Sequence, residues 1–188
     1  MMNFGTKQLI RGEDFSWIIY LGTIKDIDKS TNANPSVVTV PAHGFSSATK
    51  KGIRDHLGNT AINNTASNPL HTITVVDANT FSVPIVGISD GFGGEVLTPE
   101  DLTGKTVTCH LRKDRMDTAT AGASNVLFSP TVTVAVGTDG KVTISIAKAL
   151  TFKDAVGGLT LDTYAGDILV NNTYYAYFDI KCVKSSSR

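Results

Sequence analysis

Strict alternation of apolar and polar side chains is the feature that most constrains this chain. Residues 131–147, TVTVAVGTDGKVTISIA, alternate on both sides of a short turn, Thr138-Asp139-Gly140. Successive side chains of a β-strand point to opposite faces, so each arm presents one apolar face. Glycine in the turn supplies the positive φ of a tight hairpin. Residues 73–83, ITVVDANTFSV, predict a second hairpin about Asp77-Ala78-Asn79.

Strand patterns of this kind recur through most of the chain. They predict strands at 7–21 (interrupted at Gly12), 37–40, 50–54, 72–76, 81–86, 106–112, 131–136, 141–147 and 174–183. Helix signals predict only one turn from Thr98 to Gly104 and one or two turns from Thr151. Strands spaced by turns predict an all-β sandwich or barrel.

A change of composition divides the chain. Residues 25–70 are rich in Asn, Ser, Thr and Ala, and a glycine-rich stretch, GFGGE, follows at 91–95. We expect a discontinuous sandwich of residues 1–33 and 95–188, with a small β module of residues 34–94 inserted into one of its loops. Insertions of this kind are tolerated because lengthening an exposed loop costs little entropy.

The balance of charge disfavours nucleic acid as a partner. The 188 residues include 17 basic and 17 acidic ones, a formal net charge of zero. The one basic cluster, Lys50, Lys51 and Arg54, is followed at once by Asp55, which is typical of a solvated strand face. No segment has the pattern of a signal peptide or a membrane span, so we expect a protein made in the cytoplasm that has no membrane partner.

The residues capable of chemistry do not form a recognisable motif. His43, His56, His71 and His110 lack the spacing of a helical zinc site. Nucleophile elbows, phosphate-binding loops and dinucleotide fingerprints are missing from the sequence. We therefore expect no catalytic, cofactor-binding or metal-binding residue and no enzyme activity, with a metal site assembled from distant residues as the alternative.

Two cysteines lie on the apolar faces of predicted strands. Cys109 follows the pattern Val107-Cys109-Leu111, and Cys182 follows Phe178-Ile180-Cys182. Buried, reduced thiols that act as small hydrophobic groups are expected. A disulfide would be possible only if the two strands were neighbours.

The stretches VVTVPAHGFS (37–46) and HTITVVDANTFSVP (71–84) resemble the FCCH-like β module of tail proteins from tailed bacteriophages. In such a module His43 and Gly44 form a corner between strands. The resemblance implies that Gly44 adopts a turn dihedral and that His43 packs or hydrogen-bonds locally.

The flanking motifs resemble the immunoglobulin-like sandwich at the N-terminus of phage baseplate upper proteins and fibre proteins. They are, in chain order, Arg11-Gly12-Glu13, Asp101-Leu102-Thr103-Gly104, Arg112 and the segment YYAYFD at 174–179. The resemblance implies an immunoglobulin-like β-sandwich with an inserted FCCH-like module. It also implies a structural component of a tailed-phage virion.

In such a virion we expect the protein to act in the tail, baseplate or neck, where it would link a hub to fibres or to neighbouring subunits. Its expected partners are other phage virion proteins and further copies of itself. One alternative is a carbohydrate-binding module that uses Tyr164, Tyr174, Tyr175 and Tyr177, and another is a capsid decoration protein.

Two further features bear on these interfaces. Phe15, Trp17 and Ile19 share one face of a strand whose other face carries Ile18 and Tyr20, so the strand is expected either at the centre of the sandwich or under a partner. The polar loops 59–69 and 114–125 are expected to be mobile, or ordered only by contacts in the assembly.

Overall fold

The structure, a computed structural model, describes residues 2–10, 13–65, 69–112, 129–134, 137–147 and 163–183. The chain divides into two compact units, one of Met1–Ile19 with Leu102–Arg188 and the other of Tyr20–Asp101. Strands dominate the described residues, which also contain two short 3-10 turns, η1 (Thr60–Ile62) and η2 (Gly137–Asp139). The predicted all-β class is confirmed.

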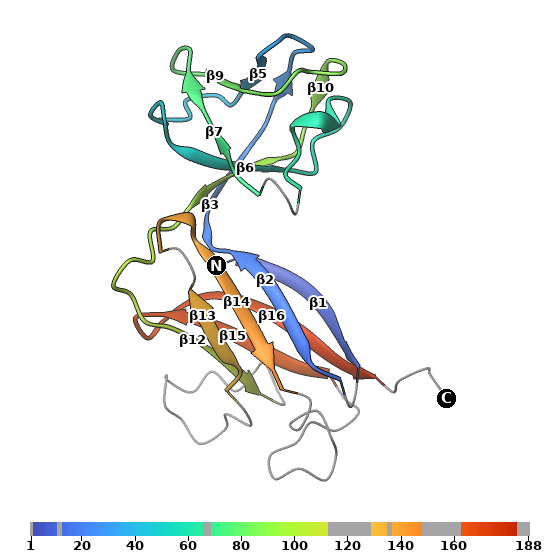
Figure 1. The fold of residues 1–188 in the computed structure, drawn as a ribbon, viewed down its shortest axis with the longest axis vertical. Coiled ribbons are helices and arrows are strands. Elements are labelled where there is room, and N and C mark those ends of the chain that lie inside the picture. Colours follow the sequence, from blue (N-terminus) through green and yellow to red (C-terminus); the bar gives the residue numbers. More distant parts are fainter. Residues whose placement is uncertain are drawn as a thin grey trace. The chain divides into compact units, whose positions relative to one another are not determined.

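The first unit is a sandwich of two sheets (Figure 1). One sheet has the order β1 (Met2–Ile10), β16 (Thr173–Val183), β15 (Thr163–Val170) and β12 (Val107–Arg112). The other has the order β13 (Thr131–Val134), β14 (Lys141–Ile146) and β2 (Phe15–Tyr20).

The strand order of this unit is that of an immunoglobulin-like domain. Strands β12, β15 and β16 share one sheet, as strands C, F and G of immunoglobulin domains do. Strands β2, β13 and β14 share the other sheet, as strands B, D and E do. The first strand, β1, joins the sheet of β16 and runs parallel to it. The second unit is inserted between β2 and β12, the second and third strands of the sandwich.

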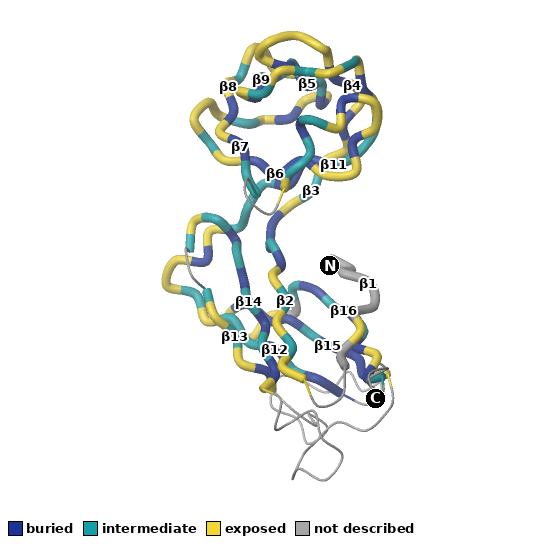
Figure 2. Tube along the Cα trace, turned by 45° about the vertical axis from the view of Figure 1, so that its right-hand side comes forward, coloured by how far each residue is buried: buried dark blue, intermediate teal, exposed yellow. Residues whose placement is uncertain are grey.

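The two sheets of the sandwich enclose an apolar core. Burial alternates along β14, whose Val142, Ile144 and Ile146 are inaccessible (Figure 2). Phe178 of β16 is also buried, and its ring and the Trp17 ring form a T-shaped pair with centroids 5.1 Å apart. The Trp17 face of β2 therefore belongs to the core. The opposite face does not, since Ile18 is 50% exposed. Strand β2 lies at one edge of its sheet.

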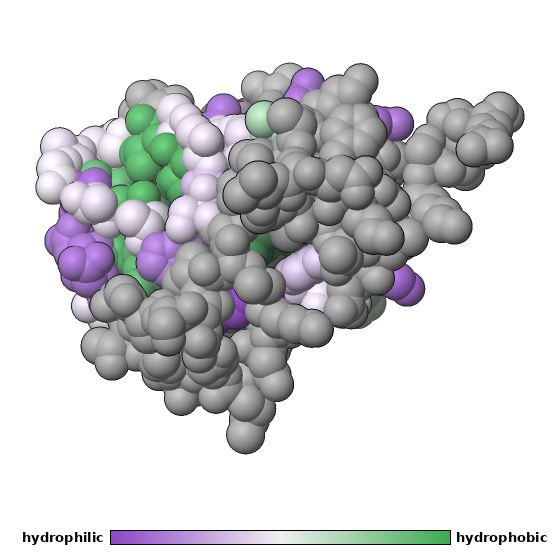
Figure 3. Space-filling view, turned by 90° about the horizontal axis from the view of Figure 1, so that it is seen from below, coloured by the Kyte–Doolittle hydropathy of each residue, from purple (hydrophilic) through white to green (hydrophobic). Residues whose placement is uncertain are grey.

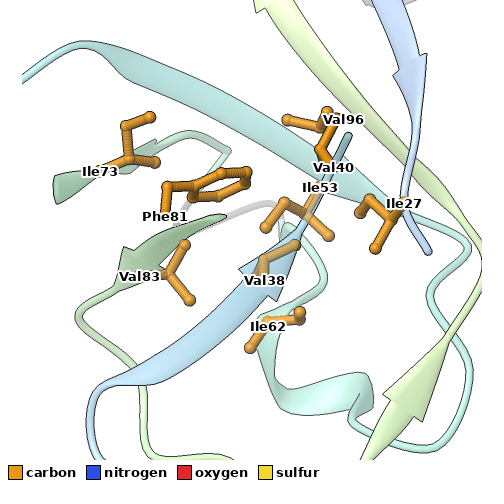
Figure 4. Close-up of a cluster of buried hydrophobic side chains, with 9 residues drawn as sticks. All are labelled: Ile27, Val38, Val40, Ile53, Ile62, Ile73, Phe81, Val83 and Val96. Atoms are coloured by element: carbon orange, nitrogen blue, oxygen red, sulfur yellow. The ribbon is translucent and has the colours of Figure 1, made fainter. Parts of the chain in front are cut away.

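The second unit contains two further sheets. The first has the order β10 (Gly91–Phe92), β4 (Lys29–Ser30), β5 (Ser36–Thr39), β9 (Thr80–Val83) and β8 (Thr74–Val75). The second has the order β3 (Gly22–Asp26), β11 (Glu95–Pro99), β6 (Lys50–Arg54) and β7 (His71–Thr72). Their core consists of Ile27, Val38, Val40, Ile53, Ile62, Ile73, Phe81, Val83 and Val96 (Figure 4).

The boundaries of the inserted unit differ from those expected. It begins at Tyr20 and not at residue 34, because β3 pairs with β11 and β4 pairs with β5. It ends at Asp101 and not at residue 94, because β11 pairs with both β3 and β6. The glycine-rich stretch at 91–95 is therefore part of the inserted unit.

Both predicted hairpins are confirmed. Strands β13 and β14 are antiparallel, from Thr131 opposite Ser145 to Val134 opposite Val142. Strands β8 and β9 flank Asp77, whose carboxylate accepts the amide hydrogens of Asn79 and Thr80. The predicted helical turn at Thr98 is wrong: Thr98 and Pro99 end β11, because their partners are Thr23 and Gly22 of β3. The turns predicted from Thr151 lie outside the described residues.

Several strands lie outside the predicted ranges, and β15 is the longest of them. Its connection to β16 is a two-residue turn in which both Asn171 and Asn172 have positive φ, 50° and 63°. This is the type I′ geometry that favours asparagine. The Asn-Asn pair is thus a local sequence signal for this hairpin.

Candidate functional site

A cluster of hydrogen-bonded polar side chains lies inside the inserted unit. Ser30, Ser36, His56 and Asn59 come from β4, β5 and the turn after β6, and none is more than 3% exposed. Polar groups removed from water in this way require partners, and a fully bonded network fixes the elements that carry it. Because it contains a serine hydroxyl in contact with a histidine ring, we consider this cluster as the candidate functional site.

His56 and Ser30 form the central pair of the cluster. The Nδ1 atom of His56 lies 2.5 Å from the carbonyl oxygen of Gly93, which can only accept a hydrogen bond. Nδ1 therefore carries the proton, and Nε2 accepts a hydrogen bond from the Ser30 hydroxyl at 2.8 Å. The same arrangement activates a serine nucleophile in hydrolases.

The surroundings of the pair leave no space for a substrate. His56 is 1% exposed, and a Cβ added at Gly91 would lie under 3.0 Å from its Nε2. The Ser30 hydroxyl also accepts a hydrogen bond from the Asn59 amide at 3.2 Å. In this conformation the pair joins β4 to the turn after β6, which is a structural role.

Asn59 connects the cluster to two other segments. Its amide nitrogen also donates to the carbonyl of Thr31 at 3.0 Å and to the Ser36 hydroxyl at 2.9 Å. Its amide oxygen accepts the backbone N–H of Ile88 at 3.1 Å. One fully buried side chain thus ties together residues that are 23 to 29 positions away in the sequence.

The prediction for the His43-Gly44 corner is confirmed. Gly44 has φ of 65°, a conformation that favours glycine. The Nδ1 atom of His43 accepts the backbone N–H of Phe45 at 2.8 Å, and the two rings are stacked with centroids 4.7 Å apart. The His43 ring also forms a T-shaped pair with the ring of the core residue Phe81, so the buried histidine packs against the apolar core.

The basic cluster at 50–54 differs from the expected solvated face. Lys50 and Arg54 are exposed, but Lys51 is only 4% exposed, and its ammonium lies 4.5 Å above the centre of the Phe45 ring. Burial lowers the pKa of Lys51. Arg54 pairs with Glu95 across the strands β6 and β11 at 2.6 Å.

The two remaining histidines belong to different units of the chain. His71 is buried and lies 2.8 Å from the carbonyl oxygen of Ile62, and desolvation lowers its pKa. His110 belongs to β12 of the sandwich, where burial and the nearby Arg112 lower its pKa. Across the described ranges, no three His, Cys, Asp or Glu side chains are grouped so that they could hold a metal ion.

The polar loop 59–69 was expected to be mobile or to be ordered only by contacts in the assembly. In the described part of this loop, two asparagine side chains bond the backbone of neighbouring segments. Asn63 bonds the backbone of His56 through both its oxygen and its nitrogen, and Asn64 accepts the N–H of Ile53. These contacts hold residues 59–65 against β6. The other polar loop, 114–125, lies outside the described residues.

In the sandwich, both cysteines are buried. They belong to β12 and β16, and β15 lies between these strands, so the condition for a disulfide is not met. Cys109 faces the core and the adjacent His110 faces the opposite side, as strand geometry requires. On that side Arg112, 1% exposed, donates to the Asp167 carboxylate at 2.9 Å.

The tyrosines named for carbohydrate binding do not form an exposed platform in the part of the chain that the structure describes. Tyr164 is buried, and Tyr175 and Tyr177 are half-buried. The side chain of Tyr174 lies outside the described atoms.

Among the residues that the structure describes, most of the large exposed apolar side chains belong to the inserted unit. Leu57, Val76, Val86, Ile88 and Phe92 are each more than half exposed. Leu57 and Phe92 are direct partners across an isolated antiparallel bridge, with each N–H bonded to the carbonyl of the other. Their side chains therefore lie on the same face as neighbours. In the view of Figure 3, apolar residues also reach the surface among weakly polar ones.

Comparison with known proteins returns no match, either among protein-family models or among curated proteins. The described residues contain no helix with the length and apolar character to cross a bilayer.

Proposed function

We propose that this chain is a structural component of a tailed-phage virion, in the tail, baseplate or neck. It would act through protein–protein interfaces that link a hub to fibres or to neighbouring subunits. The proposal rests first on the order of sequence motifs: an FCCH-like stretch lies inside the segments that resemble the sandwich of baseplate proteins. The observed insertion of one β unit into a loop of another agrees with that order.

The observation that carries the proposal is the contrast between what the inserted unit buries and what it exposes. Its Ser–His pair and its asparagine are enclosed and fully engaged, whereas Leu57 and Phe92 are 55% and 61% exposed as direct neighbours. Adjacent exposed apolar side chains are a feature of surfaces that contact another protein. A subunit whose function lies in its contacts fits this pattern.

The test is the protein content of purified particles. Virions of a phage that encodes this chain would be banded on a density gradient and analysed by quantitative mass spectrometry, with an antibody against the chain used for electron microscopy. We expect the chain at a fixed copy number per particle and labelling at the tail or neck. A chain that remains with the host lysate and is missing from intact particles would refute the proposal.

A further inference from the structure

Two lysines of the inserted unit project from the core-facing side of one sheet. Lys25 of β3 and Ile53 of β6 are both opposite Val96 of β11, so these three side chains share a face. Lys51 is two residues before Ile53 and lies on the same face. Because Ile53 and Val96 are fully buried in the core, this is the inner face of the sheet (Figure 4).

The ammonium groups of the two lysines meet around Phe45, which follows the corner after β5. The Lys51 nitrogen is 4.5 Å from the centre of the ring, and the Lys25 nitrogen is 5.9 Å from it. Lys25 also donates to the carbonyls of Ala42 and His43 at 3.0 and 2.9 Å. We call Lys25, His43, Phe45 and Lys51 the Phe45 cluster.

Two donors of the Phe45 cluster have no acceptor among the residues that the structure describes. Lys51 is 4% exposed, and the contact of its ammonium is with the Phe45 ring, which offsets only part of the cost of burying a charge. Burial alone lowers the pKa of Lys51. In His43, Nδ1 accepts the N–H of Phe45, so the buried Nε2 carries the proton, and it too lacks a partner. Since buried donors normally have partners, the cluster has donors in excess of its own acceptors.

The acidic residues of the neighbouring elements have other partners. Asp26 and Glu95 are opposite each other on β3 and β11 and belong to the outer face of the sheet, where Glu95 pairs with Arg54. The Asp77 carboxylate accepts two backbone N–H groups of its own turn. Within the described part of the chain, no carboxylate forms an ion pair with Lys25 or Lys51.

We propose that the Phe45 cluster binds a carboxylate, which the ammonium groups of Lys51 and Lys25 hold beside the Phe45 ring. A single negative charge suits the cluster, because Lys25 already shares its ammonium with two carbonyls and Lys51 does not. Hydrogen bonds between an ammonium and a carboxylate are about twice as strong as neutral ones. The half-buried Phe45 ring offers an apolar contact, which favours an organic acid over inorganic phosphate. This binding does not depend on a role in the virion.

The test is a titration of the full chain, labelled with nitrogen-15, in which NMR follows the amide shifts of Gly44 and Phe45. The probes are sodium acetate, sodium benzoate and sodium phosphate, each added up to about 200 mM while sodium chloride is lowered in step, so that screening stays constant. We expect both carboxylates to give saturable shifts. Benzoate should bind more tightly than acetate, because its ring contacts Phe45, and phosphate should bind more weakly than either.

Three variants locate the binding site. Lys51→Met keeps the apolar stem, removes the ammonium and should weaken acetate binding at least about tenfold, which corresponds to one charge-assisted hydrogen bond. Lys25→Met changes an exposed position and should weaken binding less. The matched control is Lys50→Met, because this neighbouring lysine is exposed and lies on the opposite face of β6, and it should bind as the wild type does.

Thermal unfolding in chloride buffer separates a binding role of Lys51 from a structural one. Lys51→Met should unfold at the temperature of the wild type or above it, since the substitution removes an unpaired buried charge. A lower unfolding temperature would mean that the ring contact alone accounts for the lysine, and it would overturn the inference.

The titrations offer three further refutations. They are shifts that rise without saturating, a Lys50→Met control that loses binding as Lys51→Met does, and phosphate that binds more tightly than both carboxylates. The particle analysis of the proposed function is unaffected by any of these results.

Discussion

Replacing Asn59 with alanine tests whether the buried polar cluster stabilises the inserted unit. The substitution removes three hydrogen bonds donated to Ser30, Thr31 and Ser36 and leaves the N–H of Ile88 without its partner. A net hydrogen bond contributes about 1 kcal/mol, and a buried group left unpaired costs about 1–3 kcal/mol. The remaining hydroxyls keep one bond each, to His56 and to the Thr31 carbonyl, which limits the loss. We expect a destabilisation of about 3 kcal/mol.

The measurement is urea unfolding of the full chain, followed by two probes. Far-UV circular dichroism reports on the strands of both units. Fluorescence reports on the sandwich, because Trp17 is the only tryptophan of the chain and contacts Phe178 there. We expect Asn59→Ala to shift the circular dichroism transition of the inserted unit to lower urea. The matched control, Asn32→Ala, changes an exposed side chain and should lie within about 0.5 kcal/mol of the wild type. Equal stability of the two variants would contradict this account of the cluster.

Three further predictions follow from the same structure. In thermal unfolding, Gly91→Ala should destabilise the inserted unit by more than about 2 kcal/mol, because the added Cβ would lie under 3.0 Å from backbone and side-chain atoms. Gly44→Ala should cost only about 1 kcal/mol, because its Cβ would meet nothing within 4 Å and the cost comes from the φ of 65° alone. Burial lowers the pKa of His71 below its usual 6.5, so the unfolded chain binds the proton more readily than the folded chain. The free energy of unfolding is therefore highest above about pH 6.5 and falls as the pH drops towards the folded-state pKa. Urea titrations at several pH values should show a flatter slope for His71→Gln. Burial also raises the pKa of the Cys109 thiol, and both Cys109 and Cys182 are buried. A thiol reagent should therefore label neither cysteine in the native protein and both in denaturant. Rapid labelling of the native protein would contradict this packing.

The buried cluster also illustrates why residue chemistry alone does not define a site. His56 and Ser30 have the contact and the tautomer of a base and its nucleophile, yet the close approach of Gly91 and the bond from Asn59 fill the space where a substrate would bind. A polar network of this kind gives the surrounding segments a unique arrangement, because each member loses a partner if any segment moves.

Sequence reasoning located the features that depend on neighbouring residues. Alternation of apolar and polar side chains identified β5, β6, β9, β12, β13, β14 and β16, since a strand with one buried face must repeat every two residues. The turn residues located both predicted hairpins, and glycine at position 44 indicated its positive φ. The burial of Cys109 and Cys182 also followed from their places in these patterns.

Other features depend on contacts between distant residues, and only the tertiary structure decided them. The inserted unit begins at Tyr20 because β3 pairs with the distant β11 and β4 pairs with β5. Burial does not alternate along β3, and β4 has only two residues, so neither strand shows a pattern of its own. Lys51 is buried because the Phe45 ring lies under its ammonium, although the sequence around it is typical of a solvated face. Asn59 became the centre of a polar cluster for the same reason: its four partners come from segments that no local pattern connects.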